Sequence, residues 1–129
     1  MLRNGAILAV ALALSTGALL PCARSAPPPD APDTFHAWFK SQSNSRKQLC
    51  CSIADGRILR LDQVRQTDEG WEVQFPETMA KSVGMTNVSV GDWIKVPPEN
   101  ILYTDNPTGQ PVAWFYNNEV RCFVLPPQT

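Results

Sequence analysis

Three of the four cysteines in this chain have the clearest capacity for chemistry: Cys50, Cys51 and Cys122. The fourth, Cys22, lies in an N-terminal segment that we expect to be removed on export. The three that remain allow one disulfide and leave one sulfur over. A bond between Cys122 and one of the adjacent pair would close a loop of about seventy residues, worth roughly 4 kcal/mol in the chain-entropy view. A bond between Cys50 and Cys51 is disfavoured because its eight-membered ring strains the intervening peptide. We therefore expect a structural disulfide that joins Cys122 to Cys50 or to Cys51.

The remaining thiol could bind a soft metal such as Cu(I), exchange disulfides, or act as a nucleophile beside His36. The sequence contains no C-x-x-C or C-x-x-C-H motif and no second histidine. His36 lies among aromatic residues 35–39 and fits a helix surface better than a ligand position. We predict no metal site, cofactor or catalytic residue, and we keep a periplasmic thiol protein in redox or copper handling as the alternative function.

Carboxylates are numerous enough to suggest a glycosidase pair, but such a pair needs two acids about 5 to 9 Å apart in a cleft. No spacing in the sequence selects two of the twelve Asp and Glu residues. A domain of this size also has little volume for an enclosed active site. The sequence therefore leaves enzymatic activity open and favours a non-enzymatic protein.

The N-terminus has the pattern of a signal peptide. Residues 1–4 include one arginine, residues 6–20 are mostly apolar, and Ala23 and Ser25 supply small residues at the −3 and −1 positions of a cleavage site. The apolar run is shorter than the ~20 residues that a membrane-spanning helix needs. We expect residues 1–25 to be removed, the protein to be periplasmic or secreted, and no stable membrane insertion.

The charge of the remaining chain argues against nucleic acid as a partner. Removal of residues 1–25 takes away Arg3 and Arg24, which leaves nine basic residues against twelve acidic ones. Binding to nucleic acid or an anionic membrane needs a concentrated basic surface. Arg57, Arg60 and Arg65 come nearest to one, but acidic residues alternate with them.

The chain after residue 25 divides into a leader and one domain. Residues 26–33 are rich in proline and predict an extended leader that keeps the domain away from the cleavage site. Residues 34–127 form the domain. Asp33 or Thr34 is placed to cap a short helix in which Phe35, Trp38 and Phe39 form an apolar stripe and residues 40–42 face water.

Period-two patterns follow the helix. Residues 57–66 and 71–75 predict paired strands joined by a hairpin loop at 68–70, with Leu59 and Leu61 on one face. A single helical turn is possible within 77–83, and residues 93–96 form a strand that Pro97 and Pro98 end. Residues 112–116 and 119–125 flank Asn117-Asn118 as a second hairpin, on whose second arm Val120, Cys122 and Val124 share an inward face.

These elements predict a mainly β fold: a small antiparallel sheet or SH3-like open barrel with one short N-terminal helix. The alternative is an α+β roll.

Trp93 is the best candidate for a binding residue. It lies out of phase with the inward Ile94 and Val96 and beside Lys95, so it faces solvent, a partner, or a second small core under the helix. An exposed tryptophan on a sheet can stack on a sugar ring or anchor a protein contact. We therefore take Trp93 and Lys95 as the candidate binding residues.

Five segments resemble a group of small exported proteins of alphaproteobacteria such as rhizobia. They are Cys50-Cys51-Ser52-Ile53-Ala54-Asp55-Gly56, Gly70-Trp71-Glu72-Val73, Trp93-Ile94-Lys95-Val96-Pro97, Asn106-Pro107-Thr108-Gly109 and Cys122-Phe123-Val124-Leu125-Pro126-Pro127. In that group a further cysteine commonly follows the aspartate, where this chain has Gly56. The resemblance implies an oxidising compartment and a structural origin for the odd thiol, and it supplies no catalytic residues.

Together these features predict an exported, non-enzymatic binding module for an envelope protein or an envelope glycan.

Overall fold

The computed structural model describes residues 27–79 and 84–128, so the expected signal peptide lies outside the described residues. The fold is mainly β, as predicted. Its elements in chain order are α1 (Asp33–Ser41), α2 (Cys50–Ile53), β1 (Asp55–Ile58), η1 (Leu61–Gln63), β2 (Val64–Thr67), β3 (Gly70–Gln74), η2 (Glu77–Met79), β4 (Trp93–Lys95), η3 (Pro98–Asn100), β5 (Ile101–Leu102), β6 (Val112–Tyr116) and β7 (Glu119–Val124).

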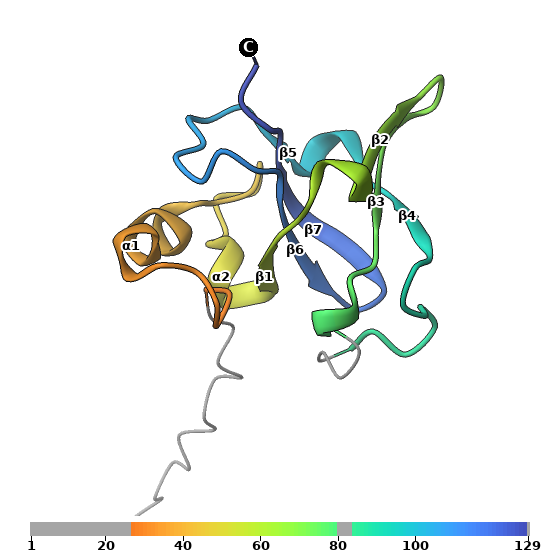
Figure 1. Ribbon diagram of the computed structural model, residues 1–129, viewed down its shortest axis with the longest axis horizontal. Coiled ribbons are helices and arrows are strands. Elements are labelled where there is room, and N and C mark those ends of the chain that lie inside the picture. Colours follow the sequence, from red (N-terminus) through yellow and green to blue (C-terminus); the bar gives the residue numbers. More distant parts are fainter. Residues whose placement is uncertain (1–26, 80–83, 129) are drawn as a thin grey trace, which may run out of the picture.

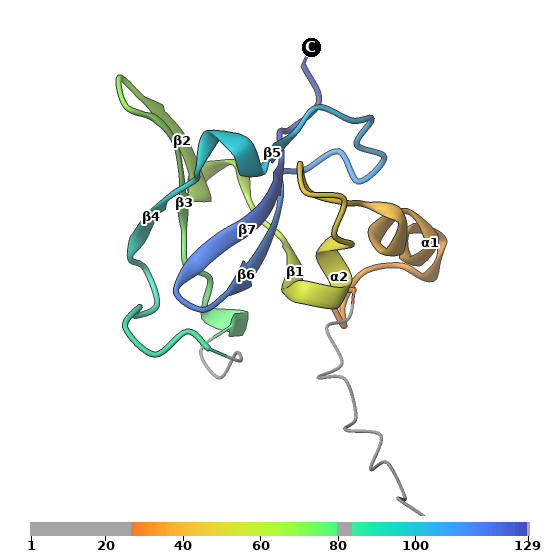
Figure 2. The same ribbon diagram turned by 180° about the vertical axis from the view of Figure 1, so that it is seen from behind.

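The strands form two sheets and no closed barrel within the described residues. One sheet has the order β1-β6-β7-β5 and the other has the order β2-β3-β4. All pairs are antiparallel except β5 with β7. The two helices lie on one side of the β6–β7 hairpin, and the three-stranded sheet lies on the other (Figures 1 and 2). Within the described ranges, no helix is long and apolar enough to cross a membrane.

The β6–β7 hairpin is buried on both faces. On β6, Val112 and Trp114 belong to the core under the helices, while Ala113 and Phe115 belong to the core against the three-stranded sheet. All four are 0 % exposed. A continuous apolar run is what a strand covered on both faces requires, because alternation would place polar groups in one core. The predicted turn is present, with φ of 52° at Asn117 and 61° at Asn118.

A β-bulge in this hairpin corrects one prediction. Cys122 pairs with Trp114 but Val120 pairs with Phe115, so Arg121 is the extra residue of β7. Val120 therefore packs into the core on the opposite side from Cys122 and Val124. The prediction that Val120 shares their face is wrong because the bulge breaks the period of two.

The prediction of one strand over residues 57–66 is also wrong, because the structure has two separate strands there. The first residues belong to β1, which pairs with β6, and the last belong to β2, which forms the expected hairpin with β3. Between them, the backbone N–H of Arg60 donates to Gln63 Oε1 at 2.9 Å and so favours a 3-10 turn over a strand. As a result Leu59 is buried, whereas Leu61 is 60 % exposed.

Helix α1 buries Phe39 and partly buries Phe35 and Trp38, as its stripe predicts. Neither Asp33 nor Thr34 caps it, because the residue before the first turn is Pro32. Gln42 was expected to face water but is buried, since its Nε2 donates to the Trp38 carbonyl.

The proline-rich leader differs from the extended spacer that its composition predicts. The Ala31 N–H donates to the Pro28 carbonyl at 3.0 Å, which closes a turn. Pro28 is fully buried, and Ala31 is part of the core under the helices. At least residues 28–31 therefore belong to the packed domain.

Gly56 on β1 provides a test of this packing. A Cβ at this position would lie 2.8 Å from Trp114 Nε1 and 3.1 Å from Trp114 Cδ1. Overpacking of this kind costs roughly 1–3 kcal/mol. We predict that Gly56→Ala lowers the free energy of unfolding by that amount, measured by urea denaturation. In a Trp114→Phe background, where the smaller ring leaves room, the same substitution should cost less; an equal cost in both backgrounds would contradict the contact.

Candidate functional site

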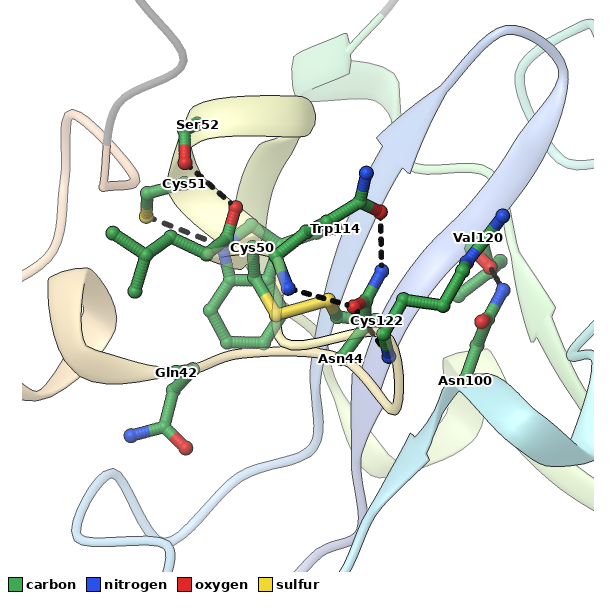
Figure 3. Close-up of a disulfide and its surroundings, with 12 residues drawn as sticks. Gln42, Asn44, Cys50, Cys51, Ser52, Asn100, Trp114, Val120 and Cys122 are labelled. Carbon is green, nitrogen blue, oxygen red and sulfur yellow. Dashed lines mark hydrogen bonds between the residues drawn. A yellow bond between two sulfur atoms is a disulfide. The ribbon is translucent and has the colours of Figure 1, made fainter.

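The disulfide joins Cys50 of α2 to Cys122 of β7. This is one of the two pairings that the sequence left open. Both residues are 0 % exposed, and the bond crosses from the helical layer to the central hairpin (Figure 3). It therefore links segments 72 residues apart in the chain.

The other thiol, Cys51, is buried in the same core and is 7 % exposed. Its Sγ–H donates to the Phe39 carbonyl at 3.4 Å. Its sulfur accepts from Trp114 Nε1 at 3.3 Å (Figure 3). Burial raises the pKa of Cys51, and the Trp114 hydrogen bond opposes that effect only in part. The thiolate, which is the form that binds metals and attacks disulfides, is therefore disfavoured.

His36 has local partners on and beside α1. Its Nε2 lies 3.0 Å from the Ala31 carbonyl oxygen, and its Nδ1 lies 3.7 Å from Asp33 Oδ1. In residues 27–79 and 84–128, no group of three or more His, Cys, Asp or Glu side chains is placed to hold a metal ion.

Trp93 lies on the outer face of the three-stranded sheet, in the phase that the sequence predicts. It pairs with Gln74 and belongs to neither core, whereas Ile94 packs against the core and Val96 is buried in it. The guanidinium of Arg65 lies 4.0 Å from the centroid of the Trp93 ring. One face of the indole is therefore covered from within the domain.

Two ion pairs lie beside Trp93. Arg65 Nε donates to Glu72 Oε2 at 2.6 Å, and Lys95 Nζ donates to Glu69 Oε2 at 3.1 Å. This face thus presents an aromatic ring among satisfied ion pairs, which is a common arrangement for a solvated sheet surface.

A groove that the sequence did not predict lies at the other side of the molecule. It has a volume of about 450 Å³, between the loop after α1 and the segment of β5. Its lining residues are uncharged: Ser41, Gln42, Ser43, Asn44, Ser45, Ile101, Leu102, Tyr103 and Thr104. Among the described large apolar side chains Tyr103 is the most exposed, at 85 %.

One wall of this groove is a loop fixed by its own hydrogen bonds. Asn44 is 4 % exposed, and its Oδ1 accepts from the backbone N–H groups of Arg46 and Gln48. The Cys50 N–H donates to the Gln42 carbonyl at 2.8 Å. The disulfide residue therefore holds the wall directly.

The other wall is β5, and the same disulfide reaches it through one neighbouring strand. Leu102 of β5 pairs with Val124 of β7, two residues after Cys122. The Cys50–Cys122 bond and this strand pairing together fix the separation of the two walls.

A second groove, of about 670 Å³, also has Tyr103 in its lining. It shares residues 102–104 with the first and adds residues 105–106 and 125–128. Two bonds hold the loop between β5 and β6 in place: Trp38 Nε1 donates to the Asp105 carbonyl at 2.9 Å, and Asn106 Nδ2 donates to the Leu125 carbonyl at 3.0 Å. Figures 1 and 2 show this loop on the same side of the hairpin as α1. Tyr103 thus lines both grooves, next to a loop that these two hydrogen bonds hold in place.

No protein-family model matches this chain, and no match is found among the curated proteins or the solved structures. Functional inference therefore rests on the chemistry of the site itself.

Cys51 gives a prediction about reactivity and pH. Native protein should react with iodoacetamide far more slowly than unfolded protein at pH 8, as mass spectrometry would measure.

Because the folded-state pKa of Cys51 is raised, the folded thiol keeps its proton at a pH where the unfolded thiol loses it. Stability should therefore be unaffected by this group below an ordinary thiol pKa of about 8.5 and should fall as pH rises above it. Cys51→Ala should remove that part of the decline; rapid labelling of the native protein would contradict the burial.

The disulfide gives a second prediction. Cys122→Ser should lower the free energy of unfolding of the oxidised monomer by roughly 2–5 kcal/mol, because the long closed loop is lost. Cys51→Ser is the matched control and should cost less, since it breaks no covalent link. Equal losses for both variants, measured in urea without reductant, would count against the structural role of the bond.

Proposed function

We propose that this protein is a non-enzymatic binding domain of the periplasm or the extracellular space, and that it binds a component of the cell envelope at the two grooves beside Tyr103. The observation that carries the proposal is an 85 % exposed tyrosine that lines two grooves, of about 450 and 670 Å³. Small-molecule and cofactor sites have volumes of roughly 300–1,000 Å³. The expected signal peptide and the disulfide support the location.

The lining of the first groove supports a binding role over a catalytic one. A serine or threonine hydroxyl becomes a nucleophile only beside a general base. The residues that line this groove include no histidine, carboxylate or lysine. Its hydroxyls can therefore recognise a ligand but lack a group to activate them.

The chemistry of Cys51 weighs against the thiol alternative. A redox or copper-handling cysteine needs an accessible thiolate in a polar or positive environment. Cys51 is buried among apolar and aromatic side chains, and its pKa is raised.

The outer face with Trp93 and Lys95 is the second candidate surface. Tryptophan and arginine are the residue types that dominate protein interfaces, and the Arg65–Trp93 stack brings them together. This surface fits a protein partner better than a sugar, because Arg65 already lies over the ring. We propose this outer face as the second binding surface, after the grooves.

One comparison separates the two surfaces. Immobilised oxidised protein lacking residues 1–25 would be incubated with solubilised envelope, and the captured material would be quantified for four proteins. Tyr103→Ala should reduce capture by about tenfold, while Trp93→Ala and the control Tyr116→Ala should behave as wild type. Tyr116 is a suitable control because it is 40 % exposed but lines neither groove. Loss on Trp93→Ala alone would instead assign binding to the outer sheet face.

A further inference from the structure

We infer that the ligand of the two grooves lined by Tyr103, called the Tyr103 grooves, is an uncharged oligosaccharide chain. This inference rests on the proposed function and names the class of its ligand. Three features of the grooves carry this inference: the absence of charge in the first groove, the supply of free hydroxyl groups, and the exposed aromatic ring that lines both grooves.

The first groove has no charged partner to offer a ligand. None of its lining side chains is an acid, lysine, arginine or histidine. Burying a charged ligand group without an opposite charge is costly, so an acidic polymer or a charged peptide terminus would gain nothing from this surface. The groove therefore selects for uncharged polar ligands.

The hydrogen-bonding groups of this groove match sugar hydroxyls. Each serine and threonine hydroxyl can both donate and accept, as can each hydroxyl of a sugar. Within the described chain the hydroxyls of Ser43, Ser45 and Thr104 have no hydrogen-bond partner, whereas that of Ser41 donates to the Trp38 carbonyl. Three hydroxyls on two walls are thus free to bond to a ligand.

Tyr103 supplies the apolar part of sugar recognition. The face of an aromatic ring packs against the C–H face of a pyranose, and the phenol oxygen stays in water. Because the two grooves share residues 102–104, a ligand can continue across Tyr103 from one groove into the other. This geometry suits a chain of at least two sugar rings better than a single ring.

The second groove adds an acidic residue. Its lining includes Asp105 together with Leu125, Pro126 and Pro127. A carboxylate accepts hydrogen bonds from sugar hydroxyls but repels an anionic residue. The surface therefore disfavours uronic acid polymers at both grooves.

The test uses defined saccharides. The oxidised protein would be applied to an array of uncharged oligosaccharides, of oligogalacturonates as the acidic arm, and of proline-rich peptides as the peptide arm. Binders would then be titrated by calorimetry at low and high salt. We expect binding only in the uncharged arm, with an affinity that salt leaves unchanged because no ion pair forms.

Variants connect the binding to the site. Tyr103→Phe keeps the ring and should bind as wild type, and Tyr103→Ala should lose about tenfold in affinity. Thr104→Val removes one free hydroxyl at constant shape and should lose several-fold, while Tyr116→Ala should have no effect. Circular dichroism should show all four folded, because Tyr103, Thr104 and Tyr116 are all exposed.

The outcomes distinguish the inference from the proposed function. Salt-sensitive binding in the acidic arm, binding only in the peptide arm, or no saccharide binding at all would overturn the oligosaccharide inference. If Tyr103→Ala still abolished capture of envelope material in those cases, the proposed site would stand with a different ligand. Saccharide binding that Tyr103→Ala leaves intact would remove both.

Discussion

The bond between Cys50 and Cys122 is the constraint on which the rest of this structure depends. It joins the helical layer, through α2, to the β6–β7 hairpin, which is buried on both faces. Small domains bury a limited fraction of their surface and draw much of their stability from such links. The link also connects the two walls of the first groove, because the Cys50 N–H binds the Gln42 carbonyl and Cys122 lies on β7, which pairs with β5.

A fixed groove has a physical advantage for weak, uncharged ligands. Saccharide binding gains little from electrostatics, so the cost of ordering the binding site decides whether any affinity remains. The loops beside the grooves are already ordered in the folded protein, because Asn44, Asn106 and Trp38 form hydrogen bonds to loop backbones. The Cys51 thiol also has a structural role, because it forms hydrogen bonds to Phe39 and Trp114 inside the core. The three cysteines of the described residues thus need no redox role.

Local signals in the sequence predicted the local structure well. The Asn117-Asn118 turn, the hairpin around residues 68–70 and the alternation of residues 71–75 depend on neighbours a few residues away, and each is present. The bulge at Arg121 and the turn at Arg60 were missed because one inserted residue or one side-chain hydrogen bond changes the period without changing the composition. The run of residues 112–115 did carry a signal for burial on both faces, since it lacks any polar alternation. The Tyr103 grooves had no such signal, because residues 41–45, 101–106 and 125–128 meet only in the folded chain.

The most direct test of the central claim is a map of the ligand footprint on the folded protein. Amide chemical shifts of isotopically labelled, oxidised protein would be followed during titration with deproteinised envelope polysaccharide. We predict the largest shifts at residues 41–45 and 101–104, which form the first groove, and little change at residues 93–95. Shifts centred on the β2–β3–β4 sheet, with the groove residues unchanged, would contradict it.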